Sequence, residues 1–260
     1  MTVSSSTNAD IDAVAALLKR AERVLFITGA GISADSGLPT YRGIGGLYHE
    51  RLTAEGLTIE EALSGEMMAQ RPDISWRYIG EIESNCRGAK PSAAHLRIAD
   101  LEAEKPGVWV LTQNVDGLHR MAGSEKVIQI HGTVHHLRCT ECPHQRSVHD
   151  FAGLDLPPAC PVCGGVLRPD IVLFGEMLPQ KGLDQLTHVL ESGVDLIVSI
   201  GTTSVFPYIS GPVWWAQQNG IPSVEINPGD TEVSDIVDYR LRMGAADAMT
   251  QLWARMHELP

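Results

Sequence analysis

Long hydrophobic runs are missing from this sequence of 260 residues. No apolar segment approaches the ~20 residues that a helix needs to cross a bilayer. The opening residues, MTVSSSTNAD, also lack the basic and then apolar layout of a secretory signal peptide. These absences predict a cytoplasmic protein with no membrane partner.

Positive charge is scarce as well. Lys and Arg number 20 against 32 Asp and Glu, which leaves a formal net charge of −12. Proteins that bind nucleic acid normally present a basic footprint to the phosphate backbone, so this balance argues against a direct nucleic-acid partner. A lysine-bearing peptide would suit an acidic surface, although such a surface also simply keeps a protein soluble.

Short apolar runs and helical patterns alternate along the chain. The expected strands are residues 24–28, 108–113, 127–130, 194–200 and 223–227. The expected helices are residues 11–22, 92–104, 182–192, 211–219 and 246–257. Near-continuous apolar strands that alternate with helices are typical of a parallel sheet covered on both faces. The sequence therefore predicts an α/β fold with a doubly wound parallel sheet.

Two segments interrupt this alternation. Residues 44–90 contain helix-like stretches around 58–70 and 73–86 and no convincing strand. Residues 135–168 contain several Pro and Gly and little periodicity. The two segments could pack together as a smaller domain beside the sheet.

Four of the five cysteines form two CxxC pairs. They are Cys139, Cys142, Cys160 and Cys163, and Cys86 stands alone. Two CxxC turns place four thiolates around one point, and four sulfur ligands close a tetrahedral zinc site. The spacing therefore predicts a structural zinc ion that holds a small insertion. A pair of redox dithiols, or His144 in place of one cysteine, is a weaker alternative.

The stretch ITGAGISADSGLPTYRG, residues 27–43, follows the first expected strand. Gly29 and Gly31 would let the backbone approach a pyrophosphate, with the next helix N-terminus behind it. The pattern is not G-x-G-x-x-G, because Ala34 occupies the third glycine position. It is therefore a poor dehydrogenase fingerprint, and alone it could be a tight strand-to-helix turn.

Three further polar clusters end apolar strands. They are Gln113-Asn114-Val115-Asp116, Gly201-Thr202-Thr203-Ser204 and Asn227-Pro228-Gly229. His131 follows another strand directly and is suited to act as a base near neutral pH. Ligands bind beyond the carboxyl ends of the strands in open α/β sheets, so we expect these clusters to share one crevice.

Together these residues resemble one family, the sirtuins, which are NAD-dependent protein-lysine deacylases. The matching motifs are GAGISADSGLPTYR (29–42), TQNVDGLH (112–119), HG (131–132), the two CxxC pairs, RPDIVLFGE (168–176), GTTS (201–204), IN (226–227) and GAA (244–246). They span most of the chain, in the family's order.

The resemblance implies a Rossmann-like NAD-binding domain with a smaller zinc-binding and helical module. The large domain would comprise residues 8–43, 91–134 and 166–260. Residues 44–90 would form the helical module, and residues 135–165 the zinc-binding insertion. NAD would be a co-substrate, consumed when an acyl-lysine oxygen attacks its ribose and nicotinamide leaves. The products would be free lysine, nicotinamide and O-acyl-ADP-ribose, and the oligomeric state stays open.

The resemblance also implies a role for each matching residue. His131 would be the general base that activates a ribose hydroxyl, and Asn114 would hold that ribose beside it. NAD would contact Gly29, Ala30, Gly31, Ile32, Ser33, Thr40, Tyr41, Arg42, Gln113, Asn114, Val115, Asp116, Gly201, Thr202, Thr203, Ser204, Asn227, Pro228, Gly229 and Ala246. The acyl-lysine peptide would pair as an added strand along Val172, Phe174 and Gly175.

The sequence departs from the family pattern at two places. Thr40 stands where many members carry Asp, and the segment after Gly201 is one residue shorter before its proline. Members that remove acidic acyl groups carry a Tyr-x-x-Arg pair, which aligns here with Ile79 and Ile82, or with Tyr78 and Glu81 after a shift of one. Neither pair would attract an acidic chain, so we expect removal of acetyl or other uncharged acyl groups.

Three other functions fit parts of the pattern. Protein mono-ADP-ribosylation would use the same NAD crevice without an acylated substrate. A non-catalytic NAD-sensing module would bind NAD without releasing nicotinamide. A hydride-transferring oxidoreductase would change the absorbance of NADH.

Overall fold

The computed structural model describes residues 8–40 and 52–259. Its larger sheet is six-stranded and parallel, in the order β3-β2-β1-β7-β8-β9. The strands are β1 (Val24–Thr28), β2 (Trp109–Thr112), β3 (Val127–Gln129), β7 (Leu196–Ile200), β8 (Ser223–Ile226) and β9 (Tyr239–Leu241). The strand order reverses between β1 and β7, which is the topological switch point of a doubly wound sheet. The predicted fold class is therefore confirmed.

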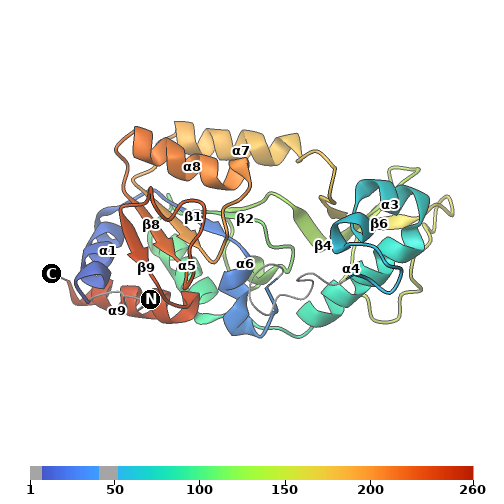
Figure 1. Ribbon diagram of the computed structural model, residues 1–260, viewed down its shortest axis with the longest axis horizontal. Helices are drawn as coiled ribbons and strands as arrows, with labels where there is room; N and C mark the ends of the chain where they lie inside the picture. Colours follow the sequence, from blue (N-terminus) through green and yellow to red (C-terminus); the bar gives the residue numbers. More distant parts are fainter. Residues whose placement is uncertain (1–7, 41–51, 260) are drawn as a thin grey trace.

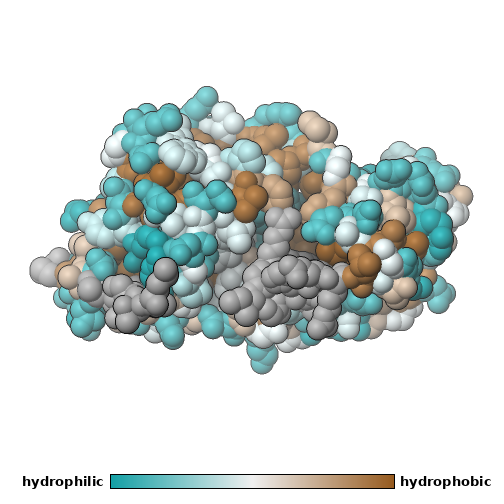
Figure 2. All heavy atoms as spheres, viewed as in Figure 1, coloured by the Kyte–Doolittle hydropathy of each residue, from teal (hydrophilic) through white to brown (hydrophobic). Residues whose placement is uncertain are grey.

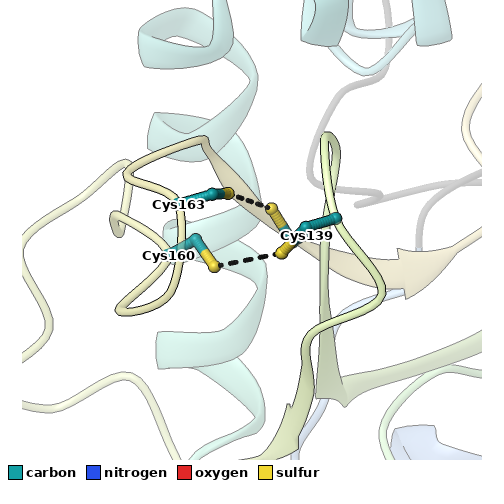
Figure 3. A group of neighbouring side chains, drawn as sticks. Cys139, Cys160 and Cys163 are labelled. Atoms are coloured by element: carbon teal, nitrogen blue, oxygen red, sulfur yellow. Dashed lines mark hydrogen bonds between the residues drawn. The ribbon is translucent and has the colours of Figure 1, made fainter.

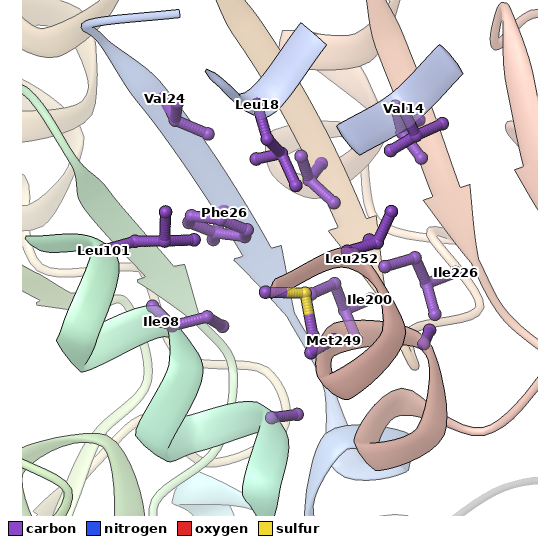
Figure 4. Packing of buried hydrophobic residues seen from close by; sticks show 14 of the residues in the cluster. Val14, Leu18, Val24, Phe26, Ile98, Leu101, Ile200, Ile226, Met249 and Leu252 are labelled. Atoms are coloured by element: carbon purple, nitrogen blue, oxygen red, sulfur yellow. The ribbon is translucent and has the colours of Figure 1, made fainter. Parts of the chain in front are cut away.

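Helices cover both faces of this sheet (Figure 1). One layer contains α1 (Asn8–Arg20), α5 (Ala93–Glu104) and α9 (Ala245–Glu258), and the other contains α7 (Gln180–Glu191) and α8 (Pro207–Gln218). Successive side chains of a strand point to opposite faces. Phe26 accordingly packs with Leu18, Leu101 and Leu252 on the first face (Figure 4), whereas Ile27 belongs to the cluster on the second. This alternation explains why every residue of β1 is apolar or buried.

A smaller module lies at one end of the larger sheet (Figure 1). It contains the helices α2 (Ile59–Ala62), α3 (Gly65–Gln70) and α4 (Pro72–Cys86) and an antiparallel sheet in the order β5-β4-β6. The strands of that sheet are β4 (Gly132–Cys139), β5 (Gln145–Ser147) and β6 (Leu167–Ile171). Trp76 of α4 is fully buried and donates its indole N–H to the Leu167 carbonyl at 2.9 Å. The helices and the small sheet thus share one apolar core.

Several elements differ from the sequence-based expectation. The helix expected around 58–70 is split into α2 and α3, because Ser64 caps α3 and forms a bridge with Phe174. The small sheet, β9 and the short helix α6 (Leu118–Met121) were not predicted. β5, β9 and α6 are only three or four residues long, and β4 pairs with β6 across a long intervening segment. The proposed division into domains stays a prediction; in the structure, β6 pairs with β4 of the small sheet.

The outer surface is ordinary for a folded chain. Hydrophilic residues predominate on the face shown in Figure 2, and hydrophobic residues occur there in small groups. Within the described residues, no helix is long and apolar enough to cross a membrane.

Candidate active site

The candidate site begins where β1 and β7 end side by side. The backbone N–H of Gly29 donates to the Ile200 carbonyl at 3.1 Å, and that of Gly31 donates to the Gly201 carbonyl at 2.8 Å. A Cβ on Gly31 would lie 2.6 Å from the Gly201 Cα, so the two loops approach too closely for a side chain. Residues 30–36 form a 3-10 helix, η1 (Ala30–Ser36), and not the expected α-helix. Two glycine-rich turns thus lie against each other at the switch point, where ligands bind in open α/β sheets.

The loop after β2 is bonded directly to this first loop. Asn114 Nδ2 donates to the Gly29 carbonyl at 3.0 Å and to Ser33 Oγ at 3.2 Å. The Ser33 hydroxyl in turn donates to the Asp116 carboxylate at 2.8 Å. Burial raises the pKa of Asp116, and hydrogen bonds from the Leu118 N–H and Ser33 oppose that shift. Ser33, Asn114 and Asp116 therefore form one polar cluster, as their positions at strand ends predicted.

The loops after β7 and β8 join the same cluster from the other side. Gln113 Nε2 donates to Thr202 Oγ1 at 2.8 Å, and Asn227 Nδ2 donates to the Thr202 carbonyl at 3.1 Å. Ser204 is buried at a positive φ of 56°, and its Oγ has no partner among the described residues. A buried hydroxyl without a partner is uncommon, and it suits a ligand that supplies acceptor oxygens, such as a phosphate or ribose.

His131 lies at the end of β3, beside this cluster. Its Nδ1 is 3.2 Å from the Gln113 carbonyl, and its Nε2 is 2.7 Å from the Tyr208 hydroxyl. A carbonyl only accepts hydrogen bonds, so Nδ1 carries the proton and Nε2 is the acceptor. Burial lowers the pKa of His131, while the bond to the Gln113 carbonyl opposes that shift. The imidazole is thus neutral near neutral pH, with its basic nitrogen fixed by its partners.

The position of His131 depends on the residue after it. Gly132 has a φ of 77°, and a Cβ there would lie 1.9 Å from the Asp170 carbonyl oxygen. Only glycine therefore allows the chain to turn from the larger sheet into β4 at this point.

Behind the crevice lies a pair of buried histidines that the sequence did not single out. The rings of His95 and His119 are 4.7 Å apart, and both side chains are almost fully buried. His119 Nε2 is 2.9 Å from Thr28 Oγ1, which donates to Thr112 Oγ1, and that oxygen accepts the Asn114 N–H. Burial lowers the pKa of His95 to about 4 and that of His119 well below its ordinary value. Both rings are therefore neutral supports beneath Asn114.

The segment proposed to meet a peptide follows β6. The Val172 N–H donates to the His131 carbonyl at 3.0 Å, which places this segment next to the histidine. Phe174 donates to the Leu63 carbonyl and accepts from the Gly65 N–H, both at 3.0 Å, and its side chain is 40% exposed. Because both backbone groups of Phe174 and the N–H of Val172 are engaged, an added strand would need the Val172 carbonyl and Gly175 for its backbone bonds.

The four cysteines of the two CxxC pairs converge as predicted (Figure 3). Their sulfur atoms all lie within 4.8 Å of one another, with Cys139 and Cys163 at 3.5 Å and Cys142 and Cys160 at 3.7 Å. Sulfurs about 2.3 Å from a tetrahedral zinc ion would be about 3.8 Å apart. The donor set therefore fits a structural zinc ion with no open position. His144 is not part of this group.

The remaining predicted residues lie around the crevice or outside the described residues. Ala30, Ile32, Thr40, Val115 and Thr203 belong to the same loops, and Ile32 is fully buried while Thr203 is exposed. The Gly229 N–H donates to Asn227 Oδ1, beside Pro228, and the Ala246 N–H donates to the Asp35 carboxylate of η1 at 3.0 Å. Tyr41 and Arg42 lie outside the described residues.

Comparisons with known proteins agree with this geometry. The model of the Sir2 family matches residues 29–207. The chain is 48% identical to the NAD-dependent protein deacylase 2 of Pseudomonas aeruginosa, over 96% of this chain and 99% of that protein. It also resembles the crystal structure of a Sir2 homologue in complex with NAD, with a TM-score of 0.86 and 33% identity over 99% of this chain and 97% of that one. A Sir2 complex with a p53 peptide and NAD⁺ has a TM-score of 0.81 and 29% identity, over 95% of this chain and 98% of that one.

Proposed function

The chain belongs to the Sir2 family and is an NAD-dependent protein deacylase, and we propose that it transfers uncharged acyl groups from lysine to the ADP-ribose part of NAD. The observation that carries the proposed mechanism is the neutral, half-buried His131. Its Nδ1–H is held by the Gln113 carbonyl, so Nε2 is the basic nitrogen. This is the state that a general base needs before it takes a proton from a ribose hydroxyl.

The loops at the switch point would hold NAD. Gly29, Gly31 and Ser33 would line the pyrophosphate, since they belong to the turn that lies against Gly201 at the switch point. The unpartnered Ser204 Oγ would donate to the phosphate or adenosine side. Asn227 would hold the adenosine ribose, as its side chain is fixed at the end of β8. NAD is consumed here as a co-substrate, whereas zinc only holds the insertion.

Asn114 and Asp116 would act where the glycosidic bond breaks. The leaving nicotinamide departs as a neutral molecule, so the site needs fixed dipoles and little water rather than a strong acid. Asn114 is fixed by Gly29 and Ser33, and Asp116, which accepts the Ser33 hydroxyl, is only 9% exposed. Val115, between them, packs against the apolar core of the small module.

The acyl preference follows from α4. Ile79 and Ile82 are buried in the same apolar core against which Val115 packs, and neither offers a charge or a donor to an acyl chain. Glu81 is exposed on the outer side of α4, so the shifted alignment places no carboxylate in that core. Burying an unpaired carboxylate next to these side chains would be strongly unfavourable. Acetyl and other uncharged acyl groups therefore suit this site.

The substrate would be an acyl-lysine peptide or protein in the cytoplasm. The related complex with a p53 peptide supports a peptide substrate. Backbone pairing along Val172 and Gly175 would tolerate many peptide sequences, because the bonds do not depend on side chains.

The decisive experiment measures nicotinamide release and free lysine with an acetyl-lysine peptide. We expect His131→Ala to lower deacylation by about 10²-fold or more, as loss of a general base does. His136→Ala is the matched control, because His136 lies only five residues further along, on β4, where its ring nitrogens contact Ser147 and Gln145 of β5. Equal turnover by wild type and His131→Ala would show that the base is another group.

A second experiment compares acetyl-, succinyl- and fatty-acyl-lysine peptides of one sequence. We expect the acetyl and fatty-acyl peptides to react and the succinyl peptide to react poorly. Efficient desuccinylation would contradict the role given to Ile79 and Ile82.

A further inference from the structure

The basic nitrogen of His131 is already occupied. Imidazole Nε2 has one lone pair in the ring plane, and it accepts the Tyr208 hydroxyl at 2.7 Å. A ribose hydroxyl that must lose its proton therefore meets Tyr208 Oη before it meets Nε2, or else it must displace the phenol.

The Tyr208 ring is held firmly where it is. Pro207 forms the first residue of α8, and Ile209 and Val213 fix that helix in the apolar core beside β7 and β8. The ring stacks on Phe206 with centroids 5.4 Å apart and planes 12° apart, and it meets His131 edge to face at 5.7 Å. Displacement of the phenol would break the stack and the hydrogen bond together, so a phenol that stays in place is favoured.

We propose that Tyr208 is a catalytic proton relay between the ribose hydroxyl and His131. This inference rests on the proposed function of His131 as the base. The ribose O–H bond breaks and its proton goes to Tyr208 Oη, while the phenol O–H bond breaks and that proton goes to Nε2. The ribose oxygen keeps the bonding pair and uses it to bond to the acyl carbon. Tyr208 is neutral before and after the step, and His131 becomes an imidazolium that keeps its Nδ1–H bond to the Gln113 carbonyl.

The relay acts only after nicotinamide has left, which separates it from the first chemical step. The Tyr208→Phe variant keeps the ring and its stack on Phe206 and removes only the hydroxyl. We expect this variant to exchange labelled nicotinamide into NAD, in the presence of acetyl-lysine peptide, within about 3-fold of wild type. Deacylation should fall by about 10²-fold, the typical contribution of a positioned proton-transfer group.

Tyr239→Phe is the matched control. Tyr239 lies on β9 and packs against the apolar cluster on the face of the sheet covered by α1, α5 and α9, opposite to α8. The double variant His131→Ala with Tyr208→Phe should deacylate no more slowly than His131→Ala alone, since both groups serve one proton path. Comparable thermal midpoints would show that the folded state is intact.

Two results would overturn the relay. Unchanged or faster deacylation by Tyr208→Phe would show that the phenol is displaced or is a competitor for Nε2. An equal loss of exchange and deacylation would show a merely structural contact. Absence of nicotinamide release by the wild-type enzyme would instead refute the proposed function, so the two failures are distinguishable.

Discussion

Replacement of His95 by Asn isolates the contribution of one buried imidazole to acid stability. His95 is fully buried, and its Nδ1 accepts the Ser92 N–H at 3.2 Å at the start of α5. Asn Oδ1 reaches nearly the same place as Nδ1 and accepts the same bond, but it does not titrate. The variant thus keeps the cap of the helix and removes the proton equilibrium.

The magnitude follows from the pKa of His95, which burial lowers from 6.5 to about 4. As the pH falls below 6.5, the unfolded chain takes up a proton that the folded chain refuses, so the free energy of unfolding decreases. The contribution of His95 is fully present above pH 6.5 and is lost progressively down to about pH 4. About 2.5 pH units at 1.36 kcal/mol each amount to roughly 3 kcal/mol.

The assay is urea unfolding at a series of pH values between 4 and 6.5, followed by far-UV circular dichroism. We expect wild type to lose roughly 3 kcal/mol more than His95→Asn across this range, whatever their difference at pH 6.5. Acid-driven release of zinc affects both proteins alike and cancels in the comparison. Parallel curves for wild type and His95→Asn would refute the assignment of a buried, neutral imidazole.

Four further predictions concern other parts of the molecule. Gly31→Ala should raise KM for NAD at least 10-fold, because its Cβ would lie 2.6 Å from Gly201, whereas Gly211→Ala, which meets nothing within 4 Å, should behave as wild type. Lys105→Met should lower the free energy of unfolding in urea by about 2 kcal/mol, because Lys105 Nζ donates to three carbonyls near the end of α1. An unchanged urea midpoint would contradict this. Removal of zinc with a strong chelator, or Cys160→Ser, should lower the thermal midpoint, and metal analysis should find one zinc per chain if the four cysteines form one site. The acidic limb of kcat/KM for deacylation should have its midpoint below pH 6.5, because burial lowers the pKa of His131; a midpoint above 6.5 would contradict that direction.

The sequence alone determined much of the larger sheet and of its ligand-binding edge. Continuous apolar runs identify buried parallel strands, and the polar residues that follow such runs must meet at the carboxyl edge. Gly29, Asn114 and Thr202 therefore came together as expected, as did the four cysteines, whose spacing within each pair is local. These features depend on the order of residues along the chain and on the spacing of apolar residues and cysteines, both of which can be read directly from a sequence.

Other features were decided only in three dimensions. The small sheet pairs Gly132–Cys139 with Leu167–Ile171 across a long intervening segment, and neither strand alternates strictly between buried and exposed residues. His95 and His119 are ordinary residues of two separate helices until the packing of the fold places their rings together and excludes water.

The clearest example is the contact between His131 and Tyr208. The motif HG identified the histidine, but nothing in the segment VFPY indicates that its tyrosine meets Nε2 from a helix 77 residues further along the chain. Which atom a base touches depends on the packing of whole elements, here α8 on the larger sheet, and that packing is a sum over many weak contacts. The sequence by itself determined which groups gather at the site, and the tertiary structure decided which of them are bonded to one another.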